Sequence, residues 1–116
     1  MYYMNIEKTI MNINLRPKMF IEKMRIDNLY FLLTGYLLCA QGTEINEEID
    51  TIFRREFNNW SINWILINLD RDFSTEVGPW YYLFQKSAKT EEEAVENFFQ
   101  ASKEFFDEYH KDNSKT

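Results

Sequence analysis

The chain of 116 residues is poor in the residue types that most catalytic and metal sites use. It contains one His, one Cys, three Gly and two Pro. A structural zinc site needs more His or Cys ligands than these, and a phosphate-binding loop needs clustered glycines. Asp107 and His110 could share one face of a helix, but a dimetal site in a helical bundle would need a second acid–His pair. We therefore expect no enzymatic activity, no metal and no cofactor.

Basic residues are also outnumbered, with 13 Lys and Arg against 19 Asp and Glu, for a net charge of −6. Residues 1–25 carry +3, whereas residues 26–89 carry −4 and residues 90–116 carry −5. This sign argues against nucleic acid as a partner and favours a basic protein. An acidic surface that only keeps the chain soluble is the alternative explanation.

Long apolar runs are missing as well. The longest, from Leu29 to Ala40, spans about 12 residues and is interrupted by Thr34 and Gly35, which is too short to cross a bilayer. The first residues show no apolar segment of the length that a signal peptide needs. We expect a cytoplasmic protein without membrane contact. Cys39 lies inside the apolar run and is expected to be a small buried side chain.

What the sequence does contain is a large apolar and aromatic fraction, 45% and 17%, which predicts a packed core in a single domain over residues 1–116. Apolar spacing of three and four predicts helices over residues 27–41 and 44–69, from residue 74 or 79 onward, and over residues 90–110. The predicted fold class is therefore all-α, a bundle of about four helices. Residues 1–14 are interpreted as a short extended arm, with a strand near residues 9–16 as an alternative, and residues 111–116 as a flexible tail.

Two details of the helix at residues 27–41 bear on its place in the fold. Apolar residues nearly encircle it, which favours a central position with contacts on several sides. Asp27 is expected to cap its start, Gly35 to allow one close approach, and Gly42 to end it.

Carboxylates gather near two predicted helix starts. Thr90 and Glu93 have the spacing of a capping box, and acids in a first helical turn complement the helix dipole. Neither effect excludes a docking role. The candidate partner-binding residues are Glu44, Glu47, Glu48, Glu91, Glu92 and Glu96.

The segment Arg16-Pro17-Lys18-Met19-Phe20 precedes a spaced pattern that includes Leu29, Phe31-Leu32 and Thr34-Gly35-Tyr36. Together these residues resemble a group of small bacterial proteins, some of which are immunity proteins of polymorphic or contact-dependent toxins. The resemblance implies a stoichiometric inhibitor that binds a toxin domain without chemistry of its own. The Arg-Pro segment also has a structural interpretation, in which Met19, Phe20 and Ile21 pin the arm against the next helix.

Two functional hypotheses follow. The first is an immunity or antitoxin-like protein that neutralises a basic toxin, such as a nuclease, through an acidic face. The alternative is a non-catalytic structural or regulatory helical module that self-associates through surplus aromatic side chains. A monomer and a homodimer both remain open at this point.

Overall fold

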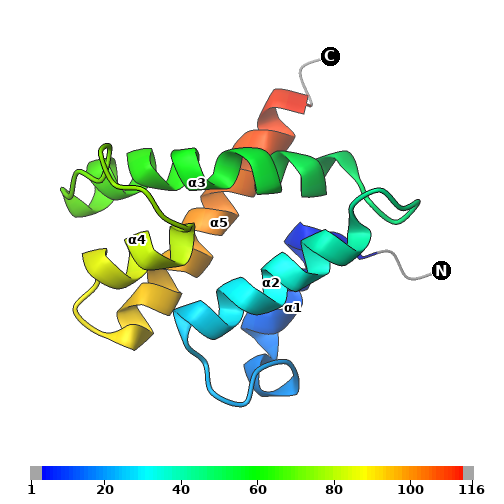
Figure 1. Cartoon of the computed structure of the whole chain (residues 1–116), viewed down its shortest axis with the longest axis horizontal. Helices are drawn as coiled ribbons and strands as arrows, with labels where there is room; N and C mark the ends of the chain where they lie inside the picture. The colour runs from blue at the N-terminus through cyan, green and yellow to red at the C-terminus, as the bar shows by residue number, and fades with distance from the viewer. Residues whose placement is uncertain (1–3, 114–116) are drawn as a thin grey trace.

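The computed structural model describes residues 4–113, which form five α-helices, one turn of 3₁₀ helix and no β-strand (Figure 1). The elements are α1 Ile6–Leu15, η1 Pro17–Met19, α2 Ile26–Ala40, α3 Glu48–Leu69, α4 Trp80–Ser87 and α5 Glu91–Asn113. In Figure 1, α3 crosses α5 and α2 runs beside α1. The domain is flat, with principal extents of 41 × 38 × 23 Å. The predicted all-α fold class is confirmed, with one helix more than expected.

The N-terminal segment is helical, so the predicted extended arm or strand is wrong. α1 follows Asn5, whose side-chain oxygen accepts a hydrogen bond of 2.9 Å from the amide three residues later. The buried Ile6, Ile10 and Ile13 have helical spacing. In the second half of α1 apolar residues alternate with polar ones, and so short an alternation is also typical of a strand. Residues 1–3 of the predicted arm lie outside the described residues.

The turn between α1 and α2 does not pin the chain as expected. Met19 and Phe20 are exposed, and only Ile21 enters the core. Pro17 stands at the start of η1, where its fixed φ and missing N–H are tolerated.

α2 is buried on one side only, which corrects the prediction of an enclosed central helix. Its buried residues are Ile26, Leu29, Leu33, Leu37 and Ala40. Its exposed apolar residues include Phe31, Leu32, Leu38 and Cys39, so Cys39 is not the buried side chain that was expected. A Cβ added to Gly35 would meet no heavy atom within 4 Å, so no close approach occurs there within the chain. α1, α4 and α5 cover the other side of α2.

The ends of α2 are fixed by one distant and one local feature. Its N-cap is Arg25 instead of the expected Asp27, and its first amide, from Ile26, donates 2.7 Å to Glu91 Oε1 of α5. Gly42 has φ of +78°, a left-handed conformation that favours glycine. The predicted role of Gly42 in ending the helix is confirmed.

α3 carries the long amphipathic stripe that its spacing predicts, and it ends at Leu69 as expected. It begins at Glu48, because Thr43–Asn46 forms a hydrogen-bonded turn. Ile45 is left outside the helix and exposed, and Ile67 is also exposed.

α4 begins at Trp80 directly after Pro79, the later of the two predicted starts. At the start of α5, Thr90 Oγ1 accepts a 3.0 Å hydrogen bond from the amide of Glu93, which is one half of the predicted capping box. The helix continues to Asn113, into the segment that was expected to be a flexible tail, and residues 114–116 lie outside the described residues.

Aromatic rings from three helices form the centre of the core. The fully buried Phe57 of α3 lies 5.6 Å from Trp80 of α4 and 5.7 Å and 5.4 Å from Phe98 and Phe105 of α5, between ring centroids. Most of these pairs are edge-to-face, the geometry that the ring quadrupoles favour. Trp80 stacks on Phe98 at 4.5 Å. The predicted use of aromatic stripes as core is confirmed here.

A buried carboxylate joins α1 to α3. Asp50 is fully buried; its Oδ1 accepts 2.7 Å from the Ile6 amide, and its Oδ2 accepts 2.9 Å from the Glu47 amide. Both donors lie at helix starts, where amides have no partner within their own helix. One side chain therefore satisfies the beginnings of two helices that are far apart in the sequence.

We expect Asp50→Ala to lower the free energy of unfolding by about 3 kcal/mol, because it leaves two helix-start amides without their acceptor. Urea denaturation followed by circular dichroism measures this. The matched control is Asp72→Ala, which removes an exposed carboxylate that accepts 2.9 Å from the Ser74 amide; its loss should be much smaller than that of Asp50→Ala, because water can replace the acceptor. Equal losses in the two variants would contradict the role assigned to Asp50.

Candidate protein-binding groove

The six acids predicted from the sequence do not form one surface. Two of them take part in holding the fold: Glu47 is the N-cap residue of α3 and accepts 3.2 Å from Asn5 Nδ2, and Glu91 accepts from the first amide of α2. Both side chains connect a helix start to a segment that is distant in the sequence.

The other four separate into two groups. Glu44 and Glu48 are exposed before and at the start of α3, while Glu92 and Glu96 are exposed in the first turns of α5. Figure 1 places these two helix starts on different sides of the molecule. The structure therefore does not join the two predicted clusters into one docking face.

Acidic side chains do converge where α3 crosses α5. A groove of about 300 Å³ lies there, which we call the α3–α5 groove. Its lining residues are Glu48, Ile52, Glu56 and Trp60 from α3, and Phe105, Glu108, Tyr109, Asp112 and Asn113 from α5. Four of these nine residues are acids, and none of the described lining residues is Lys, Arg or His. Among the predicted acids only Glu48 belongs to the groove.

The acids that the sequence reading missed are Glu56, Glu108 and Asp112. A sequence signal for them exists, because Glu48, Ile52, Glu56 and Trp60 recur every four residues and so share one face of a helix. The spacing on α3 does not show which residues of α5 lie opposite this face. That pairing depends on the crossing of the two helices.

Aromatic rings form the floor of the α3–α5 groove. Phe105 is buried and meets Trp60 edge-to-face, with 5.5 Å between ring centroids at 87°. The indole Nε1 of Trp60 donates 3.0 Å to Glu108 Oε2. This hydrogen bond holds a carboxylate beside an aromatic face, and both groups attract a cation.

The electrostatic field of the acids reaches the tyrosine in this groove. Desolvation by burial raises the pKa of Tyr109 above its ordinary value, and the nearby carboxylates of Glu48, Glu47 and Glu7 raise it further. The part of the pKa shift that comes from the carboxylates reflects a negative environment, since ionisation of the phenol would place another negative charge beside them. The same environment favours a positively charged ligand group.

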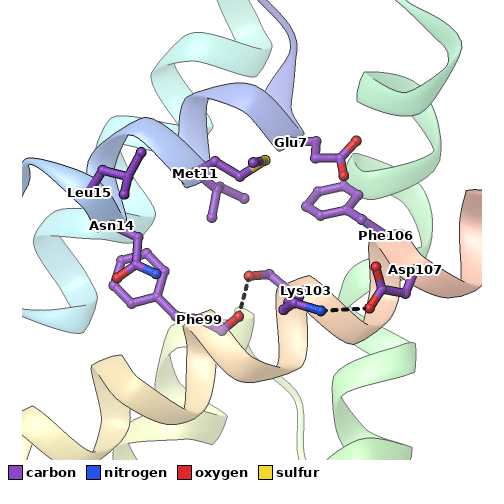
Figure 2. A pocket seen from close by; sticks show the side chains of 10 residues that line it. Glu7, Met11, Asn14, Leu15, Phe99, Lys103, Phe106 and Asp107 are labelled. Carbon is purple, nitrogen blue, oxygen red and sulfur yellow. Dashed lines mark hydrogen bonds and ion pairs between the residues drawn. The ribbon is translucent and has the colours of Figure 1, made fainter.

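A second groove, the α1–α5 groove, differs in character (Figure 2). It measures about 350 Å³, and Figure 2 shows Met11 and Leu15 of α1 facing Phe99 and Phe106 of α5 across it. Its charged side chains have partners: Lys103 forms an ion pair with Asp107 at 3.0 Å, and Glu7 Oε1 lies within hydrogen-bond distance, 2.7 Å, of His110 Nε2. These pairs leave a mainly apolar groove with little net charge, which offers a basic partner no comparable attraction.

The residues considered for metal binding have other partners. Asp107 and His110 take part in the two separate contacts just described, although they are three residues apart. Within residues 4–113, no group of three or more His, Cys, Asp or Glu side chains is arranged to hold a metal ion.

Comparisons with known proteins assign no family to this chain. No protein-family model matches the chain, and no curated protein or solved structure matches it. Among the helices of residues 4–113, none is both long enough and apolar enough to span a membrane. What is established is an all-α helical domain with an acidic, aromatic-floored groove.

We expect Glu48→Gln to lower the pKa of Tyr109 toward its ordinary value, because the substitution removes a carboxylate that disfavours the phenolate. A pH titration of the tyrosine ring carbons by NMR measures the change at this one residue. Glu92→Gln makes the same chemical change at the start of α5 and should leave the Tyr109 titration in place. An unchanged Tyr109 pKa in Glu48→Gln would contradict the negative field assigned to the groove.

Proposed function

We propose that the protein is an immunity or antitoxin-like inhibitor that binds a basic toxin domain through the α3–α5 groove and neutralises it without catalysis, in the cytoplasm. One observation carries the proposal: four carboxylates surround an aromatic floor, with no basic side chain among the described lining residues. A surface of this kind fits Lys or Arg side chains of a protein partner. The resemblance of residues 14–36 to toxin immunity proteins supports the same class.

Charge and aromatic groups support this proposal in different ways. The net charge of −6 accelerates encounter with a basic protein, because opposite fields steer diffusion. Trp60 and Tyr109 supply rigid contact area of the type that is enriched at binding hot spots. The first effect acts mainly on the association rate, and the second on the lifetime of the complex.

The first experiment identifies the partner. The candidate is a basic toxin domain encoded next to this gene, and a pull-down from the native cell should recover it in equal molar amount with this chain. If no toxin gene adjoins and no basic protein is recovered at that ratio, the proposed function is refuted.

With the partner purified in an inactive form, we expect the double variant Glu56→Gln/Glu108→Gln to associate about tenfold more slowly at low salt. Its association rate should also depend less on ionic strength, because two of the steering charges are gone. Stopped-flow fluorescence at several salt concentrations measures both. Gln at position 108 keeps an oxygen that can accept from Trp60 Nε1, so the groove floor is preserved.

The matched control is Glu92→Gln/Glu96→Gln, which removes the same charge from exposed positions in the first turns of α5. Its association rate should stay within about twofold of the unmodified chain. Equal slowing in the two double variants would mean that net charge matters and the groove does not. The reverse order would move the interface to the start of α5.

A further inference from the structure

The outward side of α2 is an apolar surface that nothing in the domain covers. It consists of Asn28, Phe31, Leu32, Gly35, Leu38 and Cys39, all of them exposed, and we call it the α2 face. None of these six side chains is charged. Phe31 and Leu38 are 62% and 64% exposed. On a chain with a net charge of −6, about three turns of helix with an uncharged, mainly apolar surface are typical of an interaction surface.

The largest side chain of the α2 face has a fixed position. The ring of Phe31 lies 5.4 Å from that of Tyr30 and 5.9 Å from that of Tyr81 of α4. These ring contacts reduce the conformational entropy that Phe31 would lose on binding. The α2 face therefore presents an ordered aromatic anchor next to a second helix.

Charges of opposite sign flank the two ends of the α2 face. Residues 16–25, just before α2, contain four bases and one acid, a net charge of +3. Residues 41–48, just after α2, contain three acids and no base, a net charge of −3. All three of these acids are exposed, as are three of the four bases. Figure 1 shows the two flanking segments at opposite ends of α2.

We propose that a second copy of this chain covers the α2 face, with the two α2 helices antiparallel about a two-fold axis at Gly35. In that arrangement the basic flank of each copy lies against the acidic flank of the other, so two favourable charge contacts form per dimer. Residues at equal separations from Gly35 then meet, which pairs Leu32 with Leu38 and Phe31 with Cys39 of the second copy. A two-fold interface requires a patch that is complementary to itself, and this one is.

The conformation of the chain supports the position of the axis. An exposed glycine inside a helix costs about 1 kcal/mol relative to alanine. Gly35 has no neighbour that would exclude a Cβ, so the fold itself does not require it. Its absent side chain allows the backbones of two α2 helices to approach closely at the axis.

Self-association on α2 is independent of the proposed inhibitor function. The α2 face and the α3–α5 groove belong to different helices, and Glu48 is the one residue shared by the groove and the acidic flank. A dimer of this kind would display two grooves. The tests that follow use this chain alone, so their outcome does not depend on any toxin partner.

Sedimentation velocity over about 1–500 µM tests the dimer directly. We expect the unmodified chain to shift from monomer to dimer with concentration and Gly35→Glu to remain monomeric, because two carboxylates would meet at the axis. Gly35→Glu should keep the helical circular dichroism spectrum, since an added Cβ meets nothing. Val77→Glu, at an exposed apolar residue between α3 and α4, makes the same charge change and should dimerise normally.

A charge swap tests the antiparallel orientation. Lys23→Glu lowers the basic flank from +3 to +1, and Glu44→Lys lowers the acidic flank from −3 to −1, so each should weaken an antiparallel dimer about fivefold or more. Combining them leaves +1 against −1 and should weaken the dimer further, whereas a parallel dimer, in which like flanks meet, would become tighter. A monomer at every concentration, a Gly35→Glu variant that still dimerises, or a double variant that dimerises more tightly than the unmodified chain would each overturn the proposal.

Discussion

The packing of Phe57 is the contact on which the arrangement of the longest helices depends. Its ring is fully buried and meets rings from α4 and α5, among them Trp80, Phe98 and Phe105. Edge-to-face geometry at these pairs is directional, so the rings fix where α3 crosses α5 as well as holding the helices together. The α3–α5 groove opens beside this crossing, because Trp60, one turn further along α3, packs against the same Phe105. The groove thus lies at the edge of the aromatic core.

The acids of this chain divide into two physical roles. At helix starts, Asp50, Glu47 and Glu91 accept hydrogen bonds from groups that have no acceptor in their own helix, and they link segments that are distant in sequence. Across the helix crossing, Glu56 and Glu108 face a groove and remain exposed. Glu56 and Glu108 therefore keep their charge available to a partner, whereas the fully buried carboxylate of Asp50 adds little to the external field. Counting acids along the sequence does not show this division, because it depends on hydrogen bonds and packing between distant segments.

α2 has more apolar surface than the other helices of this small domain cover. With 116 residues, the chain has too few helices to enclose a helix that is apolar on nearly every side. One side of α2 packs on α1, α4 and α5, and the remaining side is left as a neutral surface between a basic and an acidic flank. The α3–α5 groove and the α2 face therefore differ in the interaction that would attract a partner. The groove depends on charge, whereas the α2 face depends on apolar area and on the absence of charge.

The sequence by itself determined the all-α class, the long stripe of α3, the Thr90 cap and the end of α2 at Gly42, because these follow from spacing and local hydrogen bonds. It did not determine α1, whose stripe is short, nor the first residue of α2, which depends on Glu91 from the far end of the chain. The tertiary structure alone decided which acids share a surface. Glu56 and Glu108 are separated by 52 positions, and only the aromatic contacts between α3 and α5 bring their stripes together. Local propensity acts within a few residues, whereas the groove is produced by packing between distant ones.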